Sequence, residues 1–145
     1  MLVIGTVLAT VAPSLRGFVA SRRSSDAAAQ IAALAKHARS QAAVEGRVYR
    51  LNLDTDTGEF WLTVQNGAEF ETLPDEFGRT FSLPDGVSAR WEAPQQTENP
   101  GWIAFYPDGR TYATDIRLED TDGRITRVVC MAPAERFQII ASEER

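Results

Sequence analysis

The stretch LRGFVASRRSSDAAAQIAALAKHARSQAAVEG, residues 15–46, predicts a long amphipathic helix. Apart from one polar interval, its apolar residues recur at spacings of three and four, which is the period of one helix face. These residues are Leu15, Phe18, Val19, Ala27, Ala28, Ile31, Leu34, Ala35, Ala38 and Ala42. The remainder is mostly alanine, arginine and glutamine, which are good helix formers. Gly46 is a natural stop, because glycine readily takes the left-handed conformation just past a helix end.

The residues ahead of this helix are uncharged from Met1 to Leu15. Fifteen helical residues rise only about 22 Å, whereas the hydrocarbon core of a bilayer is about 30 Å thick. The stretch therefore fits a signal peptide, a core helix or the end of a longer membrane anchor. Pro13 predicts a bend rather than a break, because an internal proline removes one helical hydrogen bond.

A helix running from Met1 to about Glu45 would be roughly 68 Å long. A domain of this size has a radius of gyration of only about 15 Å. The first part of the helix is therefore expected to extend beyond its own domain and to be buried in something else.

After Gly46 the pattern changes to short strands. VYRLNL (48–53) and EFWLTV (59–64) alternate around DTDTG (54–58), which predicts a hairpin. Further strands are predicted over 79–83, 87–92, 102–106, 110–114, 115–120 and 124–131, and a last one at the end of APAERFQII (132–140). PDG (84–86), PDG (107–109) and TDG (121–123) are turn formers, and 93–101 is expected to be an exposed loop. One long helix followed by antiparallel strands predicts an α+β fold in which the helix covers a sheet face.

The composition indicates a globular protein with an acidic body. The chain has 145 residues, 43% of them hydrophobic and 24% charged, which suits one globular domain with a sizeable core. Residues 1–50 carry a net charge of +5 and residues 51–145 carry −10. The acidic body repels polyanions, so binding to nucleic acid is not expected. Cys130 is the one cysteine, which excludes an internal disulfide.

The order of these parts resembles a known family. An apolar helix reaching Pro13, then SLRGF (14–18), RRSSDAAAQIAALAKHARSQAAVEGR (22–47) and VYRLNLDTDTGEFWL (48–62), is similar to the general secretion pathway protein H family. Its members are pilin-like minor pseudopilins of type II secretion, related to minor pilins of the FimT type. The later IAFYPDGRTYATDIRLEDTDGRITRVVCM (103–131) is similar to the closing strands of the family. The resemblance implies a pilin-like fold.

The chain also departs from the family pattern. Family members begin with a basic leader, a glycine at the cleavage site and a mature start of Phe-Thr-Leu-Ile-Glu type. By its spacing to Pro13, Met1 falls about nine residues inside that mature start, and nine more residues would extend the uncharged run to about 24, a membrane span. Where the family often has a Gly-Arg turn before the last strand, this chain has Ala134 and Glu135 ahead of Arg136.

The resemblance implies a non-enzymatic subunit that is held in the inner membrane by a single pass, with its head in the periplasm, before it enters a filament. The expected division is a membrane and filament segment, 1–23, and a globular head, 24–145. Other major and minor pseudopilins are the expected partners through the helix, and the secretin or secreted cargo are candidate partners of the head. The residues expected to carry assembly are Leu2, Val3, Ile4, Val7, Leu8, Val11, Leu15 and Phe18, with Pro13 setting the bend.

Two acidic turns carry several carboxylates each, which is a feature of metal sites. DTDTGE (54–59) faintly resembles a calcium loop, but the twelfth position from Asp54 is Gln65 rather than the bidentate glutamate such a loop needs. A hairpin turn explains the same residues, and EDTD (119–122) before Gly123 is interpreted in the same way. No metal or cofactor is therefore expected.

His37, Cys130 and a set of strand aromatics are of residue types that can serve catalysis or binding. His37 on the helix shows no nucleophile or carboxylate partner in sequence, so a packing or solvent-facing role is preferred. Cys130 lies in an apolar strand, where a buried small hydrophobe is the default. A set of strand aromatics could line a sugar-binding face, although the sheet core is the preferred interpretation: Trp61, Trp91, Trp102, Phe60, Phe105 and Tyr106.

Three alternatives remain open at this level. A type IV pilus minor pilin that binds DNA would want an arginine cluster on the head or tail, and the tail here ends ASEER (141–145). An anchored ligand-binding module would use the tryptophans. A secreted protein would use residues 1–12 as a signal peptide, but no basic residue precedes that run and Pro13 would follow the cleavage site.

The expected orientation follows the family rather than the charges. Arg16, Arg22 and Arg23 follow the apolar run, and the positive-inside rule alone would keep the body in the cytoplasm. Family members carry a basic leader on the other side of the membrane, so we expect the body to lie outside the cytoplasm.

Overall fold

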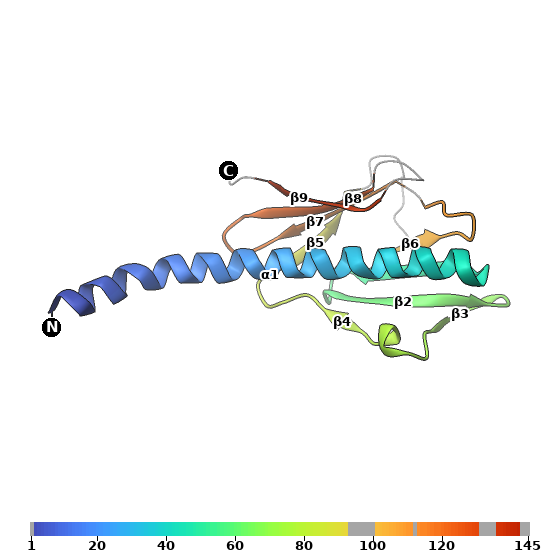
Figure 1. Ribbon diagram of the computed structural model, residues 1–145, viewed down its shortest axis with the longest axis horizontal. Helices are drawn as coiled ribbons and strands as arrows, with labels where there is room; N and C mark the ends of the chain where they lie inside the picture. The colour runs from blue at the N-terminus through green and yellow to red at the C-terminus, as the bar shows by residue number, and fades with distance from the viewer. Residues whose placement is uncertain (1, 93–100, 112, 131–135, 143–145) are drawn as a thin grey trace.

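A long helix, α1 (Leu2–Glu45), lies along two antiparallel sheets and extends past them at its N-terminal end (Figure 1). The computed structural model describes the backbone of residues 2–92, 101–111, 113–130 and 136–142, and the side chains of those residues from 22 to 140. The helix runs through Pro13 without a break and ends before Gly46, which has φ +67° and donates its N–H to the carbonyl of Ala42. Glycine makes this left-handed stop without strain, as predicted.

The first sheet has the order β3-β2-β1-β6, with β4 on the end of β2. Its strands are β1 (Tyr49–Asp54), β2 (Glu59–Asn66), β3 (Glu69–Thr72), β4 (Phe81–Ser82) and β6 (Trp102–Phe105). β1 and β2 form the predicted hairpin, in which Asp54 pairs with Glu59 and Leu51 with Leu62. Gly58 has φ +75° in the connecting turn.

The second sheet has the order β5-β7-β8-β9. Its strands are β5 (Ser88–Trp91), β7 (Thr114–Glu119), β8 (Ile125–Cys130) and β9 (Gln138–Ser142). A short 3₁₀ helix, η1 (Glu76–Gly78), precedes β4, and the Asp75 carboxylate accepts the N–H of Phe77 at its start. This architecture confirms the predicted α+β fold, in which one long helix is followed by antiparallel strands.

The core lies between α1 and the inward faces of both sheets. α1 contacts β1 and β6 of the first sheet and β7, β8 and β9 of the second. In β1 and β2 every second residue is buried in this core, as the period of two requires. The largest fully buried side chains are Phe60, Phe105, Ile31, Leu51, Leu62, Ile116, Leu118, Val128, Cys130 and Ser24. We call the opposite face of each sheet, turned away from α1, its outer face.

Some strand predictions were wrong. Among the described residues of the range 110–114, which leave out 112, the predicted strand is absent. Thr111 makes one isolated bridge with Phe105, its hydroxyl donates to the carbonyl of Ala104, and β7 begins only at Thr114. The turn at 107–109 is tight, because Tyr106 N–H donates to Arg110 O, and this leaves too few residues for a separate strand. The strand predicted over 79–83 is confined to Phe81–Ser82, and β3 and η1 were missed. Of the loop predicted over 93–101, residues 93–100 lie outside the described residues, as do Ala134 and Glu135.

Candidate functional site

The nine predicted assembly residues all lie on α1, on the part that extends past the sheets (Figure 1). They are Leu2, Val3, Ile4, Val7, Leu8, Val11, Pro13, Leu15 and Phe18. The side chains of residues 1–21 are outside the described part of the structure, so the packing of these nine stays a prediction, as does the bend at Pro13. Among the described residues, no helix combines the length and the hydropathy needed to cross a membrane.

From Ser24 onward the helix presents a buried stripe to the sheets. Its members are Ser24, Ala27, Ala28, Ile31, Leu34, Ala35, Ala38 and Ala42, each at most 3% exposed. This confirms the predicted apolar stripe from Ala27 to Ala42, joined by one serine at its start, while the packing of Leu15, Phe18 and Val19 stays a prediction. Most of its members are alanines, whose small side chains let the helix backbone approach the strands closely. The stripe fixes the second half of α1 to the head.

Polar contacts tie the helix to both ends of the head. Ser24 Oγ donates to Thr126 Oγ1 on β8 over 3.1 Å, and both residues are buried. Arg39 Nε donates to the carbonyl of Gly109 over 2.9 Å. At the C-terminal end, Tyr49 Oη donates to Glu45 Oε2 over 2.5 Å. Burial raises the pKa of Tyr49 above its ordinary value, and the hydrogen bond to Glu45 adds to the shift.

His37 has a packing role, as preferred from the sequence. Its ring stacks on that of Phe77 in η1, with centroids 3.8 Å apart and an interplanar angle of 14°. The contact holds the 3₁₀ helix against α1. Cys130 is buried in β8, also as predicted.

In each acidic turn, one aspartate carboxylate accepts hydrogen bonds from backbone N–H groups of the same turn. Asp54 Oδ1 accepts the N–H groups of Asp56 and Thr57 over 2.9 and 3.3 Å. Asp120 Oδ1 accepts those of Asp122 and Arg124, both over 2.9 Å. Asp and Asn commonly cap turns in this way. The described residues contain no group of three or more His, Cys, Asp or Glu side chains arranged to hold a metal ion.

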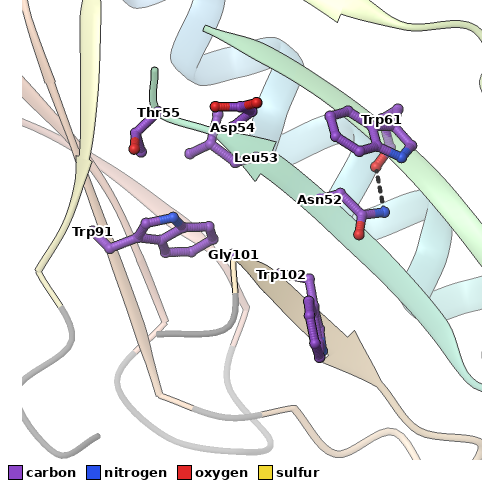
Figure 2. Close-up of a pocket in the computed structure, with 8 residues that line it drawn as sticks. All are labelled: Asn52, Leu53, Asp54, Thr55, Trp61, Trp91, Gly101 and Trp102. Atoms are coloured by element: carbon purple, nitrogen blue, oxygen red, sulfur yellow. Dashed lines mark hydrogen bonds between the residues drawn. The ribbon is translucent and has the colours of Figure 1, made fainter. Parts of the chain in front are cut away.

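The three tryptophans line one cleft, which we call the tryptophan cleft (Figure 2). Its volume is about 440 Å³, and its lining residues are Asn52, Leu53, Asp54, Thr55, Trp61, Trp91, Gly101 and Trp102. Trp61 and Trp102 flank Asn52 in register on the outer face of the first sheet, and Trp91 comes from β5 of the second. All three side chains are half-buried, so the assignment of Trp61 and Trp102 to the core was wrong. It is confirmed for Phe60 and Phe105, which are 1% and 0% exposed.

The sequence contained a signal for this arrangement. In β2, Phe60, Leu62 and Val64 share the buried face, so the residue between the first two must point the other way. Strict alternation therefore places Trp61 on the outer face, even though tryptophan is usually counted as a core residue. The position of Trp91 beside Leu53 and Gly101 depends on how the two sheets meet, and local patterning does not reveal it.

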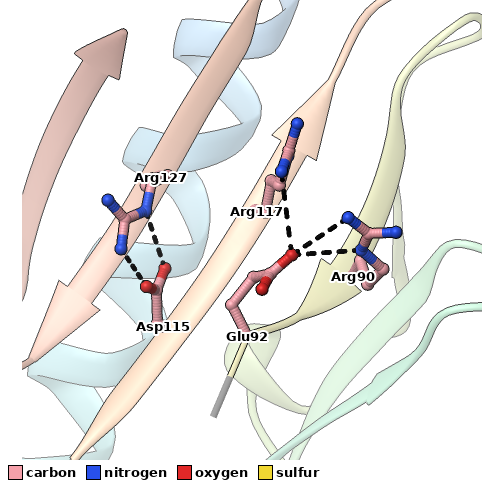
Figure 3. A network of polar contacts seen from close by, with 5 residues as sticks. All are labelled: Arg90, Glu92, Asp115, Arg117 and Arg127. Atoms are coloured by element: carbon pink, nitrogen blue, oxygen red, sulfur yellow. Dashed lines mark hydrogen bonds and ion pairs between the residues drawn. The ribbon is translucent and has the colours of Figure 1, made fainter. Parts of the chain in front are cut away.

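A row of arginines crosses the outer face of the second sheet, and the sequence analysis missed it (Figure 3). Arg90, Arg117 and Arg127 are aligned in register on β5, β7 and β8. Glu92 lies between two of them, with its Oε1 3.1 Å from Arg90 and 3.8 Å from Arg117, while Arg127 Nε donates to Asp115 Oδ1 over 3.1 Å. This hydrogen bond raises the pKa of Arg127. The interleaved carboxylates offset the like charges, which side by side would be destabilising.

A further arginine lies on the outer face of the first sheet. The Arg50 guanidinium carbon is 3.5 Å from the centre of the Phe70 ring and 4.4 Å from that of Trp102. Such stacking places the cation on the electron-rich faces of both rings. The positive charge therefore lies directly beside one wall of the tryptophan cleft.

Comparisons with known proteins agree on the fold. The sequence pattern of the family described as type II transport protein GspH matches residues 27–135. No curated protein sequence matches the chain. A crystal structure of the minor pseudopilin EpsH from the type II secretion system of Vibrio cholerae superposes with a TM-score of 0.68 and 12% identity, covering 88% of this chain and 99% of that one. The type IV minor pilin FimU of Pseudomonas aeruginosa gives a TM-score of 0.62 and 15% identity, covering 88% and 98%.

Proposed function

Because this chain belongs to the family of the type II transport protein GspH, we propose that it is a minor pseudopilin, a structural subunit of the pseudopilus that takes part in protein export by type II secretion. The observation that carries the proposal is the division of α1. Its second half is buried against both sheets, and its first half extends past them (Figure 1). A subunit built in this way has a head to display and a helix to insert among other helices.

The proposed mechanism is packing rather than catalysis. The first half of α1, with the nine assembly residues, is held in the inner membrane as part of a single pass and then exchanges lipid for the helices of other major and minor pseudopilins. Both surroundings are apolar, so the exchange itself costs little free energy. Pro13 would set the bend that lets the segment follow its neighbours. The boundary between this segment and the head is proposed to lie between residues 23 and 24.

The head is proposed to lie in the periplasm, on the surface or tip of the filament. Its acidic charge, −10 over residues 51–145, makes nucleic acid an unfavourable partner. The secretin and secreted cargo remain the candidate partners of its outer faces. The arginine row does not reverse this balance, because Glu92 and Asp115 lie within ion-pair distance of its members.

Gene deletion and complementation in the native bacterium test the proposal. Deletion should abolish secretion of type II cargo and leave surface pili in place, and the wild-type gene should restore secretion. Val7→Asp should fail to complement, because an aspartate costs about 3 kcal/mol inside a membrane helix. Val44→Asp is the matched control: Val44 is on the same helix but is 77% exposed, and this variant should complement fully.

The same experiment distinguishes the proposed function from a second candidate function. The match to FimU favours a type IV pilus minor pilin as the alternative. Loss of pili with secretion intact would establish that alternative in place of ours. Full complementation by Val7→Asp would refute the role given to the first half of α1.

A further inference from the structure

We propose that the tryptophan cleft is a binding site for a neutral carbohydrate. The inference goes beyond the role of the chain as a filament subunit and does not depend on it. It rests on which side chains line the cleft, which of their atoms are already bonded, and which charges surround them.

The lining is aromatic and accessible. Trp61, Trp91 and Trp102 are all the tryptophans of the chain, and each is only half-buried. Trp91 also packs against the core, but Trp61 and Trp102 do not, because the core is filled from the other face of their strands. Small-molecule sites typically combine aromatic walls with a few placed polar groups and have volumes of roughly 300–1,000 Å³. The cleft, at about 440 Å³, fits this description.

The polar side chains of Asn52 and Asp54, which line the cleft, are held in place by hydrogen bonds within the first sheet and its turn. Asn52 Nδ2 donates to the carbonyl of Trp61 over 3.2 Å and to Thr63 Oγ1 over 3.1 Å, which fixes the amide orientation. Asp54 Oδ1 is occupied by its own turn. Within the described part of the chain, neither Asn52 Oδ1 nor Asp54 Oδ2 receives a hydrogen bond. A complementary ligand must therefore bring donors, as hydroxyl groups do.

The cleft is flanked by one charge of each sign, the Asp54 carboxylate and the Arg50 guanidinium, which is 4.4 Å from the ring centre of Trp102. An ion of either sign is attracted by one group and repelled by the other, so neither sign of ionic ligand is favoured. What remains is a neutral ligand with a flat apolar side and several hydroxyl groups. A pyranose ring has this character: its C–H groups can lie on the electron-rich face of an indole while its hydroxyls reach the acceptors.

Intrinsic fluorescence tests this inference directly, because every tryptophan of the chain lines the cleft. The full chain is kept in a polyoxyethylene detergent, which has neither a sugar nor an ammonium group. It is titrated with three neutral oligosaccharides, cellohexaose, hexa-N-acetylchitohexaose and maltohexaose, to about 10 mM, which is high enough to detect dissociation constants in the millimolar range. Heparin oligosaccharide and tetramethylammonium serve as charged comparison probes. We expect a saturable change in emission with at least one neutral oligosaccharide and none with the charged probes.

Variants locate the site. Trp61→Ala and Trp102→Ala should each weaken binding about ten-fold by calorimetry, with circular dichroism unchanged, since one aromatic contact is lost. Ile140→Ala, which truncates a half-exposed side chain on β9, is the matched control and should bind as wild type does. Asp54→Asn keeps one acceptor oxygen for the turn but puts an NH₂ donor in place of Oδ2, so it should weaken binding about ten-fold.

The proposal is overturned if none of the neutral oligosaccharides gives a saturable change in emission, or if a charged probe binds equally well. It is also overturned if neither Trp61→Ala nor Trp102→Ala changes the affinity. These outcomes are independent of the secretion phenotype. A chain that complements the deletion and binds no sugar would refute this inference alone. A chain that binds sugar and supports no secretion would refute the proposed function alone.

Discussion

Ser24 Oγ lies 3.1 Å from Thr126 Oγ1, joining two buried hydroxyls that are 102 residues apart in the chain. The contact fixes the start of the buried stripe of α1 to β8, next to the point where the helix leaves the head. Ser24→Ala should lower the free energy of unfolding by about 1–2 kcal/mol, because the Thr126 hydroxyl stays buried without the serine. Urea denaturation followed by circular dichroism measures this change.

A double-mutant cycle separates the hydrogen bond from the packing. Ser24→Ala combined with Thr126→Val removes both hydroxyls, so its cost should fall clearly below the sum of the single changes. Costs that simply add would show that the two hydroxyls do not interact.

The alanines of the stripe should resist enlargement. Ala38 is fully buried, and Ala38→Leu should destabilise the chain by about 1–3 kcal/mol, since the larger side chain forces α1 away from the strands. Ala33 on the same helix is exposed, and Ala33→Leu should change stability by less than about 0.5 kcal/mol. Thermal unfolding compares the pair. Equal shifts in both variants would contradict the close helix–sheet packing.

The Tyr49–Glu45 hydrogen bond should make stability depend on alkaline pH. The pKa of Tyr49 is raised in the folded state, so its neutral form is favoured by folding. The corresponding stability is fully present below the ordinary tyrosine pKa of 10.0 and is lost as the pH rises above it. Between about pH 9 and about pH 11 the wild type should therefore lose stability more steeply than Tyr49→Phe. Parallel pH profiles for the two proteins would rule this out.

The Arg127–Asp115 pair should contribute more than an exposed pair. Asp115 is 7% exposed, so Arg127→Ala leaves a nearly buried carboxylate without its partner and should cost about 1–3 kcal/mol. Arg110→Ala breaks the exposed pair with Asp108 and should cost less than about 0.5 kcal/mol. Urea midpoints measure both. Adding Asp115→Asn to Arg127→Ala should recover part of the loss, and a further loss would contradict the assignment.

The sequence pattern predicted those helices and strands whose form is determined by residues close together in the chain. The helix period over 15–46 and the alternation around DTDTG were sufficient for α1 and the first hairpin. β3 was missed because its residues, such as Glu69 and Glu71, are exposed and carry no apolar alternation. η1 rests on a side-chain cap and on the stacking of Phe77 against His37, a contact between residues far apart in sequence.

The side chains that meet on the outer faces of the head could not be predicted, because strand pairings that no local sequence pattern specifies bring them together. Arg90 and Arg117 are aligned only because β5 pairs with β7, across a segment of more than twenty residues. Trp91 and Gly101 likewise line one cleft because of how the two sheets meet, which no local sequence pattern specifies. Trp61 is the exception, because the alternation of its own strand already indicated an outward direction.

α1 continues without a break from the part that extends past the sheets into the buried stripe, and this continuity has a mechanical consequence. About 33 Å of helix precede Ser24, and the stripe begins with no intervening loop or hinge. A push or a turn applied to the part before Ser24 would therefore be passed to the head through continuous helix rather than through a loop. Because the stripe is held by two sheets at once, such a load would be shared between them rather than peeling away a single strand.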